Sequence, residues 1–73
     1  MKYRIAKEWK TDTISGKEVE IDFDRNMRYN PNEIMKLIKN GYSIDYNCNL
    51  YCLKKVERIG LSEIKTFMIL EEV

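Results

Sequence analysis

The stretch NPNEIMKLIKNG, residues 30–41, decides the fold, because it carries a complete set of helix signals. Asn30 is a favoured N-cap, Pro31 suits the first helical position, and Glu33 can complete a capping box with the cap residue. The apolar stripe at i, i+3 and i+4 consists of Ile34, Leu37 and Ile38. Gly41 stands where a left-handed residue ends a helix. The stretch predicts a helix of about three turns, whose apolar stripe must pack on a sheet to be stable.

Upstream of this helix the sequence predicts a β-hairpin. Residues 2–10 and 18–24 alternate apolar and polar side chains with the period of two that strands show. The apolar positions are Tyr3, Ile5 and Trp9 in the first segment and Val19, Ile21 and Phe23 in the second. Residues 11–16 are rich in turn-forming types and connect the two strands.

Downstream of the helix the sequence predicts two further strands. Residues 44–52 alternate almost without interruption, and Ile44, Tyr46, Cys48, Leu50 and Cys52 fall on one face. This strand is expected to continue to Arg58, before a turn at residues 59–62. Residues 64–73 fit either a strand or a helix that Ser62 would cap. Their β-branched and aromatic content favours the strand.

The resulting element order is ββαββ. It predicts a small α+β fold in one domain, residues 1–73, with a four-stranded antiparallel sheet and one helix packed on a face. A chain of this size buries only about 60% of the surface that its unfolded form exposes. The expected core consists of Tyr3, Ile5, Trp9, Val19, Ile21, Phe23, Ile34, Leu37, Ile38, Tyr46, Cys48, Leu50, Cys52, Phe67 and Ile69.

The charge balance argues against a strongly electrostatic binder of nucleic acid. The chain has 13 basic and 12 acidic residues, spread evenly along its length. Proteins that bind phosphates usually show a basic excess or a basic cluster. No apolar run approaches the ~20 residues that cross a bilayer, and the N-terminus lacks the apolar stretch of a signal peptide. We therefore expect a cytoplasmic protein with no membrane partner.

The sequence predicts neither a metal site nor another cofactor. Asp22, Asp24, Asn26 and Glu33 have the spacing of calcium ligands in an EF-hand loop. The position of the required glycine is occupied by Met27, however, and a strand rather than a helix enters the loop. The chain has no histidine, so a serine or cysteine nucleophile would lack its commonest base. No enzymatic activity is expected.

The two cysteines are expected to be reduced and buried. In a continuous strand Cys48 and Cys52 would lie ~13 Å apart, at ~3.3 Å per residue. A disulfide requires Cα atoms about 4.4–6.8 Å apart. The pair can therefore form a disulfide only if one cysteine leaves the strand.

Two sets of polar residues are candidate partner-binding sites. The first, here called the acidic strip, consists of Glu18, Glu20, Asp22 and Asp24. The second, the polar row, begins at Ser43, and its candidate binding residues are Asp45, Asn47 and Asn49. An alternative interpretation of the acidic strip is an ordinary charge ladder facing Lys2, Arg4 and Lys10 across the hairpin. The polar row is unusual because strands normally contain few Asn and Asp residues.

These features predict a non-catalytic module that docks on a host or partner protein. Inhibitors of bacterial defence systems carried by phages and mobile elements, such as anti-CRISPR proteins, are one subclass of such modules. An alternative is a regulator that binds nucleic acid through Arg25, Arg28 and Tyr29, just before the helix N-terminus. A further alternative is a structural subunit that forms a homo-oligomer through an unpaired sheet edge, with the C-terminal strand as the candidate.

Overall fold

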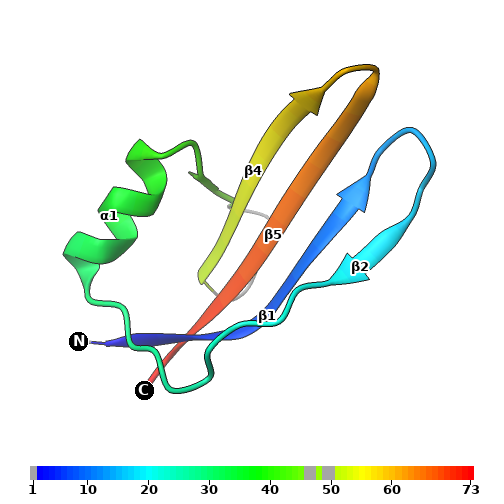
Figure 1. Ribbon diagram of the computed structural model, residues 1–73. Helices are drawn as coiled ribbons and strands as arrows, with labels where there is room; N and C mark the ends of the chain where they lie inside the picture. The colour runs from blue at the N-terminus through cyan, green and yellow to red at the C-terminus, as the bar shows by residue number, and fades with distance from the viewer. Residues whose placement is uncertain (1, 46–47, 49–50) are drawn as a thin grey trace.

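The computed structural model describes residues 2–45, 48 and 51–73 (Figure 1). Its elements are β1 (Tyr3–Asp12), β2 (Glu18–Glu20), α1 (Pro31–Lys39), β3 (Ser43–Ile44), β4 (Tyr51–Ile59) and β5 (Ser62–Glu72). Within the described ranges the strands form one antiparallel sheet in the order β2-β1-β5-β4-β3. The α+β class with one helix is confirmed. The predicted four strands are five, because the third predicted strand is divided into β3 and β4.

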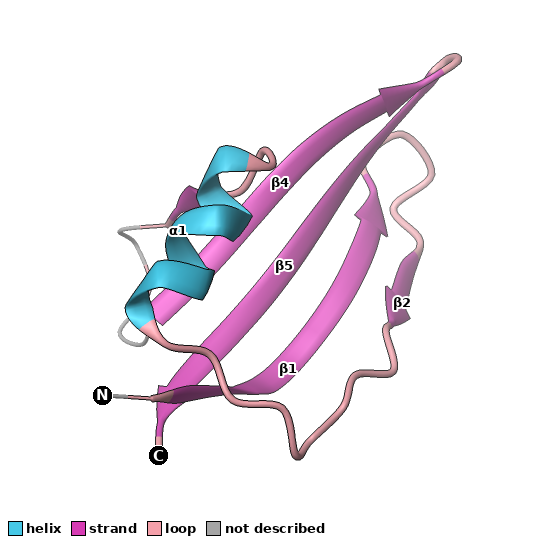
Figure 2. Cartoon of the chain, turned by 60° about the vertical axis from the view of Figure 1, so that its left-hand side comes forward, coloured by secondary structure: helices cyan, strands magenta, loops and turns pink. Residues whose placement is uncertain are grey.

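The helix begins and ends as its sequence predicts. The backbone N–H of Glu33 donates to Asn30 Oδ1 at 2.9 Å, and the N–H of Asn30 donates to Glu33 Oε1 at 3.5 Å. Gly41 has a φ of 113°, which a residue with a Cβ rarely adopts. Helix α1 lies against one face of the sheet, at the end where the two chain termini meet (Figure 2). The far ends of the two hairpins extend beyond it.

The face of the sheet under α1, here called the covered face, carries the main core. The buried residues there are Ile5, Ile34, Leu53, Met68 and Leu70. Leu53 and Leu70 are fully buried. Tyr3, Phe23, Leu37 and Ile38 pack around them, as expected. The expected core position at Val19 is wrong, because this residue is 61% exposed at the uncovered end of the sheet.

A β-bulge in β1 reverses the side-chain alternation halfway along the strand. Ile5 is opposite Leu70 on β5, whereas Lys7 is opposite Ile69, so Ala6 is the extra residue. Tyr3 and Ile5 therefore point to the covered face, and Trp9 points to the opposite face. We call this second face the open face, because no described helix packs on it. The prediction that Trp9 shares a face with Tyr3 and Ile5 is wrong for this reason.

The C-terminal segment is a strand, as favoured, but its phase differs from the expected one. Met68 and Leu70 lie on the covered face, and Phe67 and Ile69 lie on the open face. Since β5 is the central strand of the described sheet, both of its faces contact apolar neighbours. Alternation alone does not indicate which apolar set belongs to the main core of such a strand.

The continuous strand expected over residues 44–52 is not formed. Strand β3 ends at Ile44 and β4 begins at Tyr51, and neither Asp45 nor Cys48 belongs to a strand. The predictions at Tyr46, Asn47, Asn49 and Leu50 lie outside the described residues. Cys48 forms a disulfide with Cys52, with their Cα atoms 6.0 Å apart. The expectation of reduced cysteines is thus wrong, because the spacing of a continuous strand does not apply to Cys48.

No helix among the described residues is long and apolar enough to span a bilayer.

Candidate functional site

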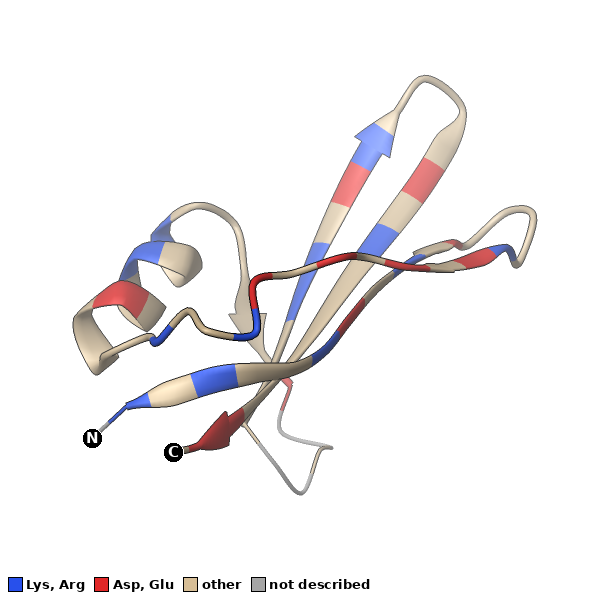
Figure 3. Ribbon diagram, turned by 60° about the horizontal axis from the view of Figure 1, so that its bottom comes forward, with Lys and Arg blue, Asp and Glu red and all other residues tan. Residues whose placement is uncertain are grey.

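The acidic strip lies along one edge of the sheet and is exposed throughout. Glu18 and Glu20 belong to the edge strand β2, and Asp22 and Asp24 follow in the segment that leaves it (Figure 3). None of the four carboxylates forms an ion pair with a described residue. The Asp24 carboxylate accepts a hydrogen bond from the backbone N–H of Asn26 at 2.9 Å, which shapes the following turn.

The register of the hairpin explains why no described lysine or arginine forms an ion pair with the acidic strip. On β1, Glu18 faces Thr11 and Glu20 faces Trp9, whereas Lys10 faces Val19 and points to the covered face. Arg4 pairs instead with Glu71 on β5, with Nε and Oε1 2.6 Å apart. The predicted ladder with Lys2, Arg4 and Lys10 is therefore absent among the described residues. The carboxylates of the acidic strip are left to solvent or to a partner.

Asp45, the described candidate binding residue of the polar row, does not join the acidic strip. Asp45 follows β3, the strand at the opposite edge of the sheet from β2. Its backbone N–H donates to the carbonyl of Cys52 at 2.8 Å. Asn47 and Asn49 lie outside the described residues. The described residues among the predicted partner-binding positions therefore divide between two opposite edges of the sheet, and the structure describes only the acidic strip in full.

The three candidate residues of the nucleic-acid alternative, Arg25, Arg28 and Tyr29, contact neighbouring parts of their own chain. Arg28 Nη1 donates to the carbonyl oxygens of Arg25 at 3.0 Å and Met27 at 3.3 Å. The guanidinium of Arg25 lies over the Phe23 ring, 5.4 Å from its centroid. Tyr29 pairs with the backbone of β1, and burial raises the pKa of its hydroxyl. The first turn of α1 carries its own capping box, which uses the backbone N–H groups of Asn30 and Glu33.

The open face carries an aromatic pair that sequence analysis assigned to the core. The Trp9 and Phe67 rings stack with centroids 5.1 Å apart and planes 17° from parallel. Lys7 Nζ lies 4.8 Å from the centroid of the Trp9 ring, as expected for a cation–π contact. The residue that could have indicated this placement of Trp9 from the sequence is Lys7. Strict alternation would place this lysine between Ile5 and Trp9 on the buried side, and a bulge removes that conflict.

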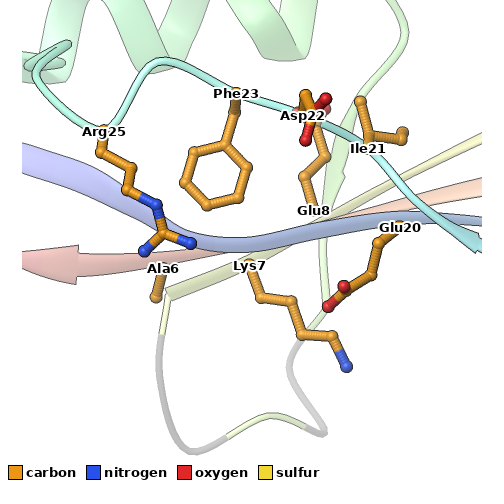
Figure 4. A pocket seen from close by; sticks show the side chains of 8 residues that line it. All are labelled: Ala6, Lys7, Glu8, Glu20, Ile21, Asp22, Phe23 and Arg25. Carbon is orange, nitrogen blue, oxygen red and sulfur yellow. The ribbon is translucent and has the colours of Figure 1, made fainter.

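A hollow of about 120 Å³ lies beside the bulge, where β1 and the segment after β2 separate (Figure 4). Lys7 and Glu20 lie on one side of β1, and Phe23 lies on the other. Burial raises the pKa of the nearby Glu8 carboxyl above its ordinary 4.5, and the charge of Lys10 opposes that rise. Charges of both signs line the hollow, so it does not select one class of ligand. No described group of three or more acidic or cysteine side chains has the arrangement of a metal site.

Comparisons with models of protein families, with curated proteins and with solved structures give no match to this chain. The functional argument therefore rests on the surfaces described above.

Proposed function

We propose that the protein is a non-catalytic binding module that docks on a basic surface of a partner protein through the acidic strip. The observation that carries this proposal is the exposure of Glu18, Glu20, Asp22 and Asp24, none of which has an ion-pair partner among the described residues. In a chain with nearly equal numbers of acidic and basic residues, this edge is a local concentration of negative charge.

The physical basis is electrostatic complementarity. Neighbouring carboxylates repel one another, and a cationic partner surface relieves this repulsion. Exposed charges of this kind mainly accelerate encounter and select the partner, while each contributes modestly to affinity. A protein that normally binds phosphates offers a suitable basic surface. An inhibitor that occupies such a surface in a host defence system is the form of this function that we favour.

The test is capture of partner proteins by a tagged chain, with two variants of matched charge. The strip variant carries Glu18→Gln, Asp22→Asn and Asp24→Asn, since Asn at 24 can still accept the turn hydrogen bond. The control variant carries Glu33→Gln, Glu57→Gln and Glu72→Gln, which remove three charges outside the acidic strip. Glutamine at 33 keeps the capping box.

Captures are run with and without nuclease and over a range of salt concentrations. The proposal expects a protein that survives nuclease, is released by salt, and is recovered at least about tenfold less with the strip variant than with the control. Equal recovery with both variants would contradict the proposal. Recovery that disappears with nuclease would favour the nucleic-acid alternative.

A further inference from the structure

Strand β2 has a neighbouring strand on one side only. It is the terminal strand of the described sheet, beside β1, and no described element lies along its outer side (Figure 1). The ladder between the two strands extends beyond β2 itself. At one end the N–H of Asp12 donates to the carbonyl oxygen of Lys17 at 2.8 Å, and at the other the N–H of Ile21 donates to that of Glu8 at 2.8 Å. Residues 17–21 therefore form one extended edge.

The backbone groups of this edge point alternately toward β1 and away from it. In an antiparallel pair, positions that are hydrogen-bonded and positions that are not follow one another along the ladder. Because residues 17 and 21 bond to β1, Val19, opposite Lys10, is the bonded position between them. The N–H and C=O groups of Glu18 and Glu20 thus point outward, and no described residue pairs with them. Unpaired backbone groups at a sheet edge are a template for a further strand.

We propose that the partner docks on the acidic strip by adding a β-strand to the outer side of β2. The added strand is an extended segment of the partner protein in which basic and apolar residues alternate. This inference rests on the proposed function and names its binding mode and the chemistry of the partner segment. In strand addition, main-chain hydrogen bonds supply affinity and alternate side chains select the sequence.

The two faces of β2 define the alternation. The carboxylates of Glu18 and Glu20 lie two positions apart on the open face, so basic side chains at alternate positions of the added strand lie directly opposite them. On the other face, Val19 is 61% exposed and lines a hollow of about 420 Å³ together with Ile59 and Ile64. An apolar residue between the two basic ones covers Val19.

The opposite edge of the sheet does not suit the same segment. Strand β3 pairs with Leu53 and Lys54, and no described strand lies beside β4 beyond that point. The open face of this edge carries Lys54 and Arg58. Like charges directly opposite one another destabilise a strand pair. The charges of the two edges therefore direct a basic segment to β2.

The test uses the purified full chain and a capped synthetic peptide of about seven residues in which lysine and valine alternate. Two further peptides carry N-methyl groups, one on two lysine amides and the other on two valine amides, so their charge is the same and different backbone donors are blocked. In antiparallel addition the lysines opposite Glu18 and Glu20 direct their N–H groups to β2. The unmethylated peptide is expected to bind with a dissociation constant of about 100 μM or lower. The peptide methylated at lysine should bind at least about tenfold more weakly than the peptide methylated at valine.

Amide hydrogen exchange measured by NMR reports on the edge directly. The N–H groups of Glu18 and Glu20 face solvent in the free chain and should exchange at least about tenfold more slowly when the unmethylated peptide is bound. Val19 is the internal control, because its N–H already pairs with β1. Glu18→Gln/Glu20→Gln should weaken peptide binding at least about tenfold, whereas the control Glu33→Gln/Glu72→Gln should change it by less than about threefold.

Equal binding of the two methylated peptides, or binding without slower exchange at Glu18 and Glu20, would overturn strand addition and leave docking by charge alone intact. No binding of the unmethylated peptide at about 1 mM would also overturn it. Sedimentation without peptide gives a further check, since self-association that Glu18→Gln/Glu20→Gln abolishes would assign the edge to a second copy instead. Failure of the partner capture alone would contradict the proposed function and leave the peptide results standing.

Discussion

The two faces of the sheet use the same strands for different purposes. On the covered face, Leu53 and Leu70 have no exposed surface and pack beneath Ile34 of the helix. On the open face, Trp9 and Phe67 stack on each other and remain partly exposed. The covered face therefore provides most of the burial that stabilises the fold. The open face retains large apolar side chains whose burial is incomplete.

This difference shows that apolar content does not by itself identify the core of a small sheet. β5 presents apolar residues on both sides, and one helix of nine residues can cover only part of one face. Large aromatic side chains that remain partly exposed beside charged residues are typical of interaction surfaces. On the open face, Asp45, Cys48 and Cys52 line a hollow together with the aromatic pair.

The largest expected effect on stability comes from shortening a buried side chain on the covered face, compared with the same change on the open face. Leu53→Ala removes a fully buried side chain beneath the helix and should lower the free energy of unfolding by about 2–5 kcal/mol. Phe67→Ala on the open face should cost less than half of that value in the isolated chain, because its ring is already partly hydrated. Urea denaturation at a concentration where the chain is monomeric measures both. Equal losses would contradict the division into a structural face and an available face.

The next effect concerns the attachment of the helix to the covered face. Asn30→Ala removes the side-chain acceptor for the Glu33 N–H and should lower the free energy of unfolding by about 1 kcal/mol. Asn32→Ala, at an exposed position in the same first turn, is the matched control and should change it by less than about 0.5 kcal/mol. Thermal or urea denaturation distinguishes the two. An equal effect of both substitutions would show that the capping box does not stabilise this helix.

The smallest effect concerns a carboxyl group within the covered face. Burial raises the folded-state pKa of Glu8 above 4.5, so the folded chain binds this proton more tightly than the unfolded chain does. The contribution of Glu8 to stability therefore falls as the pH rises from about 4.5 through the raised pKa.

Glu8→Gln removes the charge that forms in this pH range. The variant should be more stable than the wild type at pH 7, by less than about 1 kcal/mol since the group is partly exposed. The advantage should shrink below pH 4.5. Denaturation curves at both pH values measure the difference. An advantage of equal size at both values would show that burial of the charge is not its cause.

The features predicted correctly from the sequence are those controlled by neighbouring residues. The helix at residues 30–41, its capping box and its C-terminal glycine depend on contacts within a few positions. The β1–β2 hairpin and the C-terminal strand also follow from local pattern. The acidic strip was identified as a candidate surface. Its lack of ion-pair partners among the described residues depends on register, which a single strand does not specify.

The features missed depend on contacts between distant segments. The bulge at Ala6 is defined only by the pairing of β1 with β5, and it moves Trp9 to the open face. The disulfide depends on Cys48 leaving the strand direction. Leu53, Met68 and Leu70 were not assigned to the core, since alternation has the same period on both sides of a central strand.

The sequence by itself determined the class of the fold, the limits of the helix and the acidic character of one edge, because side-chain type and spacing act over a few residues. The tertiary structure decided which face the helix covers, which aromatic side chains remain partly exposed, and which charges have no ion-pair partner in the described part of the chain. These properties depend on how strands far apart in the chain are aligned. A shift of one residue exchanges the two faces of a strand.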